Sequence, residues 1–239
     1  MQAVLFDFFG TLVTYQPDRL NLDYAQTARL VHSWGYENAS ERFAEVWNAV
    51  LHTLELTTSG THAEFSMDDV VVAYEDAEQL NLSTERRSEL LDSFMSEWRV
   101  GVRPIDGVNE VLFELSGRMQ IGIVSNTHQL SLVPGLLAEF GIGVAFDPIV
   151  LSIAHGHRKP HPSIYVSALN GLESRRVRET PGAPPVDPSQ VLFVGDTYDA
   201  DYAGPTAAGM QARLIDPHAR QSIPSSHRLQ SVLDLSEMI

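Results

Sequence analysis

Five short runs of consecutive apolar residues stand out along the chain, and stretches with helical spacing of apolar and polar residues lie between them. A run in which apolar and polar residues do not alternate predicts a strand that is buried on both faces, as in a parallel sheet. Strands that alternate with helices predict a doubly wound α/β fold. The predicted strands are residues 3–9, 120–126, 148–152, 191–196 and 212–216, and the predicted helices are residues 105–117, 128–140, 161–172 and 201–209.

The segment between the first two strands breaks this alternation, because it contains no run that predicts a strand. Its apolar residues recur with helical spacing and predict amphipathic helices. Ser66, followed three residues later by Asp69, predicts a capping box. We therefore expect an all-helical insertion of residues 16–101 in a core of residues 1–15 and 102–239. The insertion's predicted helices are residues 18–35, 40–57, 67–80 and 84–100, with Trp34, Trp47 and Trp98 in the core of the bundle.

A stretch near the fourth strand, residues 174–190, is rich in Pro, Gly and charged residues. This composition predicts a long loop on the surface.

Composition excludes several classes of function. A formal net charge of −15 argues against binding to a nucleic-acid backbone, and no apolar run reaches the length of a membrane span. The N-terminus has no basic region of the kind that begins a signal peptide, and the absence of Cys excludes disulfides and thiolate chemistry. We expect a cytoplasmic protein, monomeric or homodimeric, that acts on a small molecule and has neither nucleic-acid nor membrane partners.

Polar residues follow four of the predicted strands directly. The carboxyl ends of parallel strands meet at one edge of a sheet, where open α/β sheets bind their ligands. A single Asp or Ser after a strand is usually a turn former or a helix cap, but four polar sets at one edge indicate a functional site. These sets are Asp7, Gly10 and Thr11; Ser125, Asn126 and Thr127; the segment 154–162 with Lys159; and Asp196, Asp199 and Asp201.

These residue types suit nucleophilic catalysis by a carboxylate. Asp7 is expected to attack an electrophilic centre and form a covalent intermediate. Lys159 is the single Lys among 16 Lys and Arg residues, and its compact ammonium is expected to keep Asp7 ionised and to neutralise an anionic substrate. Asp7 and Asp196 form a site of hard oxygens that suits Mg²⁺. Crowded carboxylates raise each other's pKa unless a cation is present, so the acidic cluster itself indicates a metal ion.

Four segments resemble, in order, the motifs of the haloacid dehalogenase superfamily, whose members are mostly phosphohydrolases. They are "DFFGTL" at residues 7–12, "VSN" at 124–126, "RKPHPSIY" at 158–165 and "VGDTYDADYAGPTAAGM" at 194–210. The helical insertion is similar to the family's α-helical cap of the C1 type, and the resemblance spans nearly the whole chain. It implies a Rossmann-like core, with a doubly wound parallel sheet, and an inserted all-α cap domain that opens and closes over the site.

The resemblance also implies roles for individual residues, which fall into a catalytic, a metal-binding and a substrate-binding group. Asp7 is expected to be the nucleophile and Lys159 to orient it, while Thr11 and Ser125 bind the transferring group. The expected Mg²⁺ ligands are Asp7, the backbone carbonyl of Phe9, Asp196 and, directly or through water, Asp201. Gly10, Asn126, Thr127 and His128 are expected to contact the substrate.

One position departs from the family pattern. Family phosphatases carry Asp two residues after the nucleophile, where it protonates the leaving alkoxide and then activates water, but here this position is Phe9. General acid–base catalysis contributes about 10² to 10⁴ in rate. Phe9 suits a leaving group that needs no proton, such as halide, and the family's 2-haloacid dehalogenases carry an aromatic residue here. Phe9 is also compatible with a phosphatase that has a good leaving group or another acid, and with a phosphometabolite-binding protein of low turnover.

The fourth motif favours the phosphatase. Dehalogenases need no metal and typically lack the leading acid of this motif, whereas Asp196 and Asp201 follow the phosphatase pattern. Arg29 and Arg42 bracket, without matching, the spacing of the Arg with which dehalogenases bind halide. We therefore predict a Mg²⁺-dependent hydrolase of a small phosphorylated metabolite, with a dehalogenase as the alternative.

Histidines near the motifs are candidates for the missing acid. His155, His157 and His161 surround Lys159, and His128 follows the second motif. Each imidazole can titrate near neutral pH. Positions on a loop surface or in a pocket wall are the simpler interpretation, and a transition-metal site is disfavoured. His128 or His157 as a replacement acid is a hypothesis.

Overall fold

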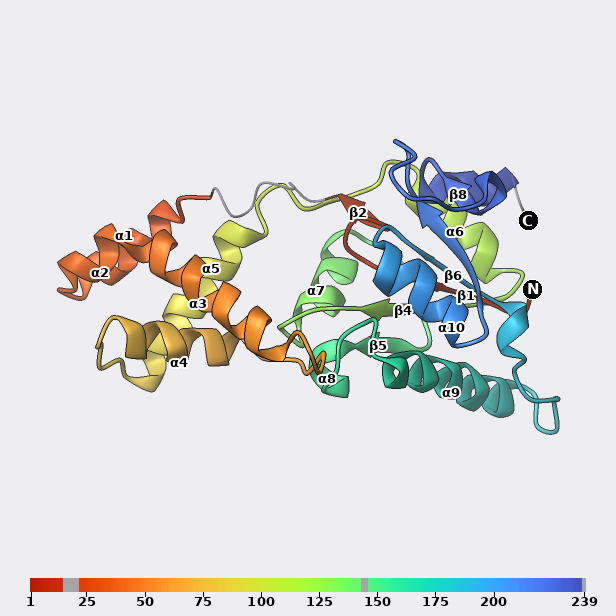
Figure 1. Cartoon of the computed structure of the whole chain (residues 1–239), viewed down its shortest axis with the longest axis horizontal. Coiled ribbons are helices and arrows are strands. Elements are labelled where there is room, and N and C mark those ends of the chain that lie inside the picture. Colours follow the sequence, from red (N-terminus) through yellow and green to blue (C-terminus); the bar gives the residue numbers. More distant parts are fainter. Residues whose placement is uncertain (15–21, 143–145, 238–239) are drawn as a thin grey trace. The chain divides into compact units, whose positions relative to one another are not determined.

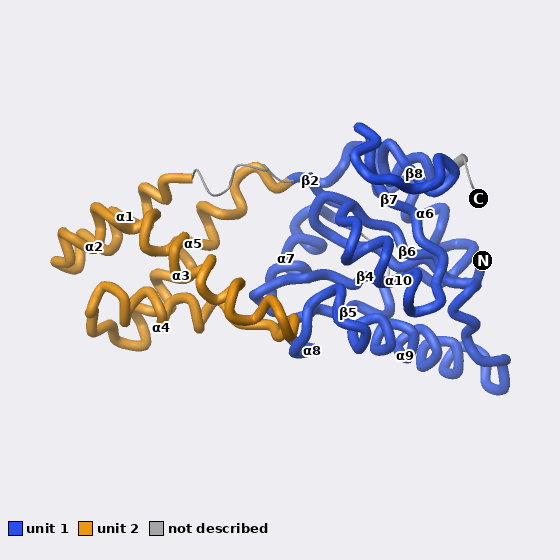
Figure 2. The backbone as a smooth tube through the Cα atoms, viewed as in Figure 1, with its two compact units in different colours: residues 1–15, 103–239 blue, residues 16–102 orange. Residues whose placement is uncertain are grey.

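A computed structural model of the chain describes residues 1–14, 22–142 and 146–237 (Figure 1). The chain divides into two compact units (Figure 2). The core unit comprises Met1–Tyr15 and Arg103–Ile239, and the helical unit comprises Gln16–Val102. The predicted boundary between residues 15 and 16, and the start of the first predicted helix at residue 18, lie outside the described residues.

The core unit is built on a six-stranded sheet in the order β5-β4-β1-β6-β7-β8. Every neighbouring pair is parallel, and β1 lies between β4 and β6. This arrangement confirms the predicted α/β fold. The strands are β1 (Ala3–Phe6), β4 (Gln120–Ser125), β5 (Ile149–Leu151), β6 (Val191–Gly195), β7 (Gln211–Ile215) and β8 (Arg228–Leu229).

Helices cover both faces of this sheet. On one face α9 and α10 pack against each other, and on the other lies α6 (Figure 1). Successive residues of β1 point to opposite faces, so Ala3 and Leu5 pack in the cluster that contains Tyr165 of α9, while Val4 and Phe6 are fully buried on the opposite face. The helices of the core unit are α6 (Val108–Ser116), α7 (Leu132–Glu139), α8 (Ser152–His155), α9 (Pro162–Glu179) and α10 (Gly204–Ala207).

The sequence prediction was wrong at several places in the core unit. The loop predicted to begin at residue 174 begins later, because α9 continues to Glu179, whose carboxylate pairs with Arg175 one turn earlier at 2.8 Å. Neither β8 nor the small antiparallel pair β2 (Val13–Thr14) and β3 (Arg103–Pro104) was predicted. Strands of two residues are too short to leave a periodic pattern in the sequence.

The helical unit contains α1 to α5 in its described part, and its second predicted helix is divided at Arg42. The predicted capping box is present: the Ser66 hydroxyl accepts from the Asp69 backbone N–H at 3.1 Å, and the Asp69 carboxylate accepts from the Ser66 backbone N–H at 2.8 Å. The bounds are α1 (Ala25–Ser33), α2 (Glu37–Glu41), α3 (Phe43–Thr58), α4 (Met67–Ala77) and α5 (Thr84–Trp98). None of the helices in the part of the chain that the structure describes is both long and apolar enough to cross a membrane.

Aromatic side chains form the centre of the helical unit. Trp47 is fully buried and lies 4.5 Å from Phe94 and 5.5 Å from Tyr74, measured between ring centroids. Trp34 and Trp98 are only half-buried, so the prediction of a bundle-core position is correct for Trp47 alone. Both half-buried residues lie at helix C-termini, where helical spacing no longer fixes the direction of the side chain.

Glu75 is a buried carboxylate that connects α4 to α5. One of its oxygens accepts from the Leu82 backbone N–H at 2.9 Å, and the other accepts from Arg87 Nε at 2.6 Å. The hydrogen bond from Arg87 contributes most to lowering the pKa of Glu75 below its ordinary value of 4.5, and the bond from Leu82 adds to it. Burial acts in the opposite direction but does not outweigh them. Glu75 therefore fixes the turn between the two helices while it is ionised.

We expect Glu75→Gln to destabilise the helical unit at pH 7 by about 1.5–3 kcal/mol, because hydrogen bonds to a charged group are lost. A carboxylate with a lowered folded-state pKa stabilises above its unfolded pKa and loses this effect as the pH falls through the folded value. The difference in stability between the wild type and the variant should therefore shrink below pH 4.5.

All three Trp residues lie in the helical unit, so urea unfolding followed by Trp fluorescence measures the stability of this unit. Glu89→Gln, an exposed position on α5, is the control, and equal midpoints for the two variants would contradict the prediction.

Candidate active site

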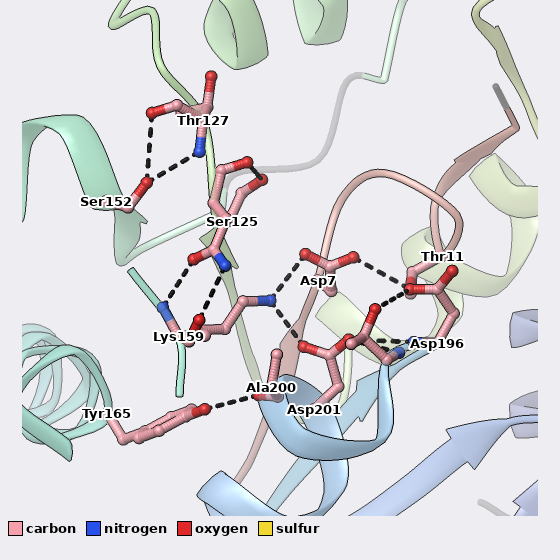
Figure 3. A network of polar contacts seen from close by, with 12 residues as sticks. Asp7, Thr11, Ser125, Thr127, Ser152, Lys159, Tyr165, Asp196, Ala200 and Asp201 are labelled. Atoms are coloured by element: carbon pink, nitrogen blue, oxygen red, sulfur yellow. Dashed lines mark hydrogen bonds and ion pairs between the residues drawn. The ribbon is translucent and has the colours of Figure 1, made fainter. Parts of the chain in front are cut away.

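The carboxyl edge of the sheet brings together side chains that lie far apart in the sequence (Figure 3). Asp7 directly follows β1, and its backbone N–H donates to the Val194 carbonyl of β6 at 2.9 Å. The ladder of hydrogen bonds therefore extends one residue beyond β1 and fixes the Asp7 backbone at the edge. The Asp7 side chain is buried, with Thr11 Oγ1 3.5 Å from its Oδ2.

Lys159 contacts two carboxylates that follow different strands of the sheet. Its Nζ lies 2.7 Å from Asp7 Oδ1 and 2.7 Å from Asp201 Oδ1, and all three side chains are buried. Lys159 belongs to the loop between α8 and α9, whereas Asp201 follows β6 in the π-helical segment Tyr198–Ala203. The ammonium thus joins three separate chain segments at the edge of the sheet.

Asp201 also fixes the turn that follows β6. Its Oδ2 accepts hydrogen bonds from the backbone N–H groups of Asp196 at 3.1 Å and Thr197 at 2.9 Å. The Asp196 side chain is only partly buried, and its Oδ1 accepts from the Thr197 hydroxyl at 3.3 Å. Asp201 is therefore engaged through both of its oxygens within the protein, and Asp196 is the more exposed of these two acids.

The charges of this cluster do not balance. Burial raises the pKa of Asp7 to about 7, and Asp201 and Asp196 act in the same direction against Lys159. Burial and Asp201 also raise the pKa of Asp196. Burial lowers the pKa of Lys159, but Asp201 and Asp7 together raise it above its ordinary value, so Lys159 stays charged. One ammonium faces three carboxylates, which leaves an excess of negative charge that a bound cation would offset.

The donor set fits a divalent cation. One carboxylate oxygen from each of Asp7, Asp196 and Asp201 lies within 4.8 Å of the others, and hard oxygen ligands are those that Mg²⁺ prefers. Gly10 allows the approach of Asp196, because its φ is +82° and a Cβ there would lie 2.2 Å from Asp196 Oδ2. The backbone carbonyl of Phe9 as a further ligand stays a prediction.

A cavity of about 370 Å³ borders the cluster. Phe9 contributes to its wall, with its ring edge-to-face with Phe8 at 5.0 Å between centroids. Among the described residues, no histidine lines this cavity. The lining residues are Asp7, Phe9, Asn126, Arg158, Lys159, Pro160, Asp196, Thr197, Asp199, Ala200 and Asp201.

Comparison with known proteins identifies the family of this chain. A profile of haloacid dehalogenase-like hydrolases matches residues 1–209. The chain is a haloacid dehalogenase-like hydrolase. The resemblance of the four motifs is thereby confirmed, whereas the C1 type of the cap stays a prediction.

Several proteins are similar to this hydrolase. Ribulose-1,5-bisphosphate 5-phosphatase of Halopiger xanaduensis is 27% identical, over 90% of this chain and 84% of its own length. Pyrimidine 5'-nucleotidase YjjG of Escherichia coli is 27% identical over 96% of each chain. Haloacid dehalogenase-like hydrolase domain-containing protein 3 of Homo sapiens is 31% identical over 58% of this chain, and the match spans about half of that protein, 51%.

A solved structure shares the fold of this hydrolase. The 2-haloacid dehalogenase of Pseudomonas syringae pv. Tomato has a TM-score of 0.63 and 22% identity, and the match covers 99% of this chain and 97% of that chain. At this identity the likeness concerns the fold alone.

Asn126 of the hydrolase holds the backbone of Lys159. Its side-chain Nδ2 donates to the Lys159 carbonyl at 3.0 Å, and its Oδ1 accepts from the Lys159 backbone N–H at 2.7 Å. Asn126 was predicted to contact the substrate. It lines the cavity, but its amide is occupied by these two bonds, so the structure gives it a role in fixing the loop of Lys159 that sequence reasoning missed.

The other residues predicted to bind the substrate or the transferring group do not line the cavity: Gly10, Thr11, Ser125, Thr127 and His128. Thr11 and Ser125 are fully buried, with Thr11 next to Asp7 and the Ser125 hydroxyl 3.4 Å from the Asn126 carbonyl. Thr127 is bonded to Ser152: its N–H donates to the Ser152 hydroxyl at 2.8 Å, and this hydroxyl donates to the Thr127 carbonyl at 3.2 Å. Thr127 and His128 are not among the residues that line the cavity.

The histidines near Lys159 take part in a local network at the start of α9. The Ser163 hydroxyl lies 2.6 Å from His155 Nε2 and 2.8 Å from His161 Nδ1, and the His161 ring stacks on His157 with 4.2 Å between centroids. His161 is also the N-cap of α9, since its Nδ1 accepts from the Ser163 backbone N–H at 3.3 Å. This arrangement supports the simpler interpretation of these side chains over a transition-metal site.

We expect Asn126→Ala to destabilise the core unit by about 2–3 kcal/mol, because the backbone N–H and carbonyl of the buried Lys159 lose their hydrogen bonds. Urea unfolding followed by far-UV circular dichroism measures the change. Asn109→Ala, at an exposed position on α6, is the matched control and should stay within about 0.5 kcal/mol of the wild type. Equal stability of Asn126→Ala and the wild type would show that the two bonds do not hold the loop.

Proposed function

We propose that this hydrolase is a Mg²⁺-dependent phosphatase of a small phosphorylated metabolite, with Asp7 as the nucleophile. The observation that carries the proposal is the acidic cluster at the edge of the sheet. Asp7, Asp196 and Asp201 each bring an oxygen within 4.8 Å of the others, and the Lys159 ammonium contacts two of them at 2.7 Å. Burying such a cluster is costly, because desolvation and the neighbouring negative charges both oppose the ionisation of each carboxyl group. A cluster of this kind therefore indicates a functional site.

Two relatives support phosphate chemistry. The Halopiger xanaduensis relative is a ribulose-1,5-bisphosphate 5-phosphatase and the Escherichia coli relative is a pyrimidine 5'-nucleotidase, and this chain matches 84% and 96% of their respective lengths. Both names denote the removal of a phosphoryl group from a small molecule. Lys159 and Arg158 border the cavity together with four acids, Asp7, Asp196, Asp199 and Asp201, so an anionic substrate would bind there once a cation offsets the acids.

The proposed reaction has two steps at Asp7. An Asp7 carboxylate oxygen attacks phosphorus, the new O–P bond forms as the bond to the leaving oxygen breaks, and the leaving group departs with the bonding electron pair. Water then attacks the phosphoryl group on Asp7 and releases inorganic phosphate, which restores the carboxylate. Lys159 holds Asp7 Oδ1 at 2.7 Å and so fixes the orientation of the carboxylate for attack.

Asp7 and Asp196, supported by Asp201 and by the predicted carbonyl of Phe9, would hold Mg²⁺. When bound, the ion supplies positive charge that offsets the charge on the phosphoryl oxygens. Lys159 would orient the Asp7 carboxylate, and Asn126 would hold the backbone of Lys159. We also propose that the helical unit of residues 16–102 is the cap domain of this hydrolase.

Phe9 supports a second candidate function, a dehalogenase of 2-haloacid type. Phe9 lines the cavity at the position where a family phosphatase has an acid, and halide leaves without a proton. Against this candidate, a halide-releasing enzyme needs no cation, so Asp196 in the acidic cluster would have no role in it. A third candidate is a phosphometabolite-binding protein with low turnover, which would use the same cavity without the reaction at Asp7.

We expect wild-type protein with Mg²⁺ to release inorganic phosphate from a panel of phosphate monoesters and no halide from 2-haloacids. Chelation by EDTA should abolish phosphate release, because the acidic cluster then lacks its cation. Asp7→Asn should reduce turnover to background while binding of inorganic phosphate stays nearly intact. Asp106→Asn, at an exposed position of the core unit, is the control and should behave as the wild type.

Two results would contradict the proposed function. Halide release that is insensitive to EDTA would assign the dehalogenase reaction. Equal background rates for the wild type and Asp7→Asn on every substrate would leave only the binding protein.

Because Phe9 cannot donate a proton, we expect turnover to depend steeply on the leaving group. Aryl phosphates with acidic phenols should be hydrolysed faster than alkyl phosphates by about 10² or more, the size of the missing general-acid contribution. The measurement is kcat/KM across a series of aryl and alkyl phosphates. A flat dependence would show that another side chain supplies the proton.

A further inference from the structure

Tyr165 of α9 donates a hydrogen bond from its hydroxyl to the Ala200 carbonyl at 2.6 Å. The side chain is fully buried, and its ring lies edge-to-face with Phe193 of β6, 6.0 Å between centroids. Figure 3 shows the hydroxyl pointing from α9 to the segment that carries Asp201. Ala200 directly precedes Asp201, so this bond fixes the backbone next to one of the two carboxylates that hold Lys159.

The segment around Ala200 is able to accept this bond because it is π-helical. Tyr198–Ala203 forms a single wide turn in place of the start of the predicted helix at 201–209. Such turns leave the regular hydrogen-bond pattern of an α-helix, and they are frequent at functional sites. The Ala200 carbonyl is thus available to a side chain from a different element.

The packing around the hydroxyl is close. Gly204, at the end of the π-helical turn, lies against the phenol: a Cβ at this position would lie 2.2 Å from the Tyr165 hydroxyl oxygen. Only glycine allows the hydroxyl to reach Ala200 here. The contact therefore depends on two residues: Tyr165 on α9, which supplies the hydroxyl, and Gly204, which leaves room for it beside the Ala200 carbonyl.

Burial raises the pKa of the Tyr165 phenol, and the charges of Asp201 and Asp7 act in the same direction. The hydroxyl therefore keeps its proton and remains a donor at neutral pH. The same two carboxylates contact Lys159, which lies six positions before Tyr165 in the chain. One chain segment, residues 159–165, thus carries both the ammonium and the hydroxyl that fixes its partner.

We propose that Tyr165 is a positioning residue of this hydrolase, whose hydroxyl holds Ala200 so that Asp201 meets Lys159 and the backbone of Asp196 in one arrangement. This inference rests on the proposed function, since it concerns the same metal-binding edge. Loss of the hydroxyl releases the Asp201 segment, and the acidic cluster then has to be ordered by the cation itself. The ordering cost appears as weaker Mg²⁺ binding.

The test is Tyr165→Phe in the full-length protein, which keeps the ring and removes the hydroxyl. The matched control is Tyr74→Phe: Tyr74 is also fully buried, and its hydroxyl donates to an alanine carbonyl, that of Ala39, at 3.2 Å in the helical unit. Calorimetric titration of the metal-free protein with Mg²⁺ gives Kd without reference to activity, and thermal unfolding gives the stability of each variant.

We expect Tyr165→Phe to raise the Kd for Mg²⁺ about tenfold, the effect of one lost hydrogen bond. Its kcat on p-nitrophenyl phosphate at subsaturating Mg²⁺ should fall and should recover at high Mg²⁺. Tyr74→Phe should lower the unfolding temperature to a similar extent and leave Kd within about twofold of the wild type. Equal Mg²⁺ affinity of Tyr165→Phe and the wild type, or equal weakening in both variants, would overturn the inference.

Gly204→Ala is a second, independent variant, because its methyl group displaces the hydroxyl without removing it. We expect a similar rise in Kd for Mg²⁺, and an unchanged Kd in this folded variant would also overturn the inference. The two proposals fail separately. If Asp7→Asn retains turnover, the proposed function is wrong; if Asp7→Asn is inactive and Tyr165→Phe binds Mg²⁺ normally, only the role of Tyr165 is wrong.

Discussion

Lys159 places a buried ammonium 2.7 Å from one oxygen of Asp7 and 2.7 Å from one oxygen of Asp201, and the arrangement of the core unit at this edge depends on that contact. Removing these charges from water is costly, and their attraction offsets the cost only where the geometry is held tightly. The surrounding chain supplies this geometry. Asn126 holds the Lys159 backbone by two hydrogen bonds, and β6 fixes Asp7 through the Val194 carbonyl.

The same constraint explains the hydrogen bonds of the turn after β6. Asp201 accepts from two backbone N–H groups as well as from Lys159, and Tyr165 holds the adjacent carbonyl from the opposite side. Each of these contacts limits where one carboxylate can move. Since one ammonium faces three carboxylates, the cluster keeps an excess of negative charge at the cavity. This excess of negative charge is the reason for proposing a bound cation at the site.

Phe9 is an aromatic residue in the mostly polar lining of the cavity. Phe9 stands two residues after Asp7 and lines the cavity, its ring packs edge-to-face with Phe8, and its side chain carries no proton to transfer. The charged groups of the site are therefore present, whereas the first motif supplies no side chain that could transfer a proton. The charged groups are Asp7, Lys159, Asp196 and Asp201, and proton transfer depends on the chemistry of the leaving group or on a group outside the first motif.

Local patterns in the sequence are enough to predict the central features of this hydrolase. Continuous apolar runs predicted β1, β4, β5, β6 and β7, and the polar residues after them identified Asp7, Lys159, Asp196 and Asp201, since parallel strands end at one edge. The order of the four motifs indicated the family. The helical insertion followed from its periodicity, and its capping box from Ser66 and Asp69.

The contacts that fix the site arise only in the folded chain. The sequence placed Asn126 at the substrate and gave Tyr165 no role of its own, because nothing in a linear pattern tells which backbone group a side chain meets across 33 or 35 positions of the chain. The strands β2, β3 and β8 contain two residues each and exist only through their partners. A periodic pattern specifies which face of an element is buried, but the hydrogen bonds between distant loops arise only when the sheet brings those loops together.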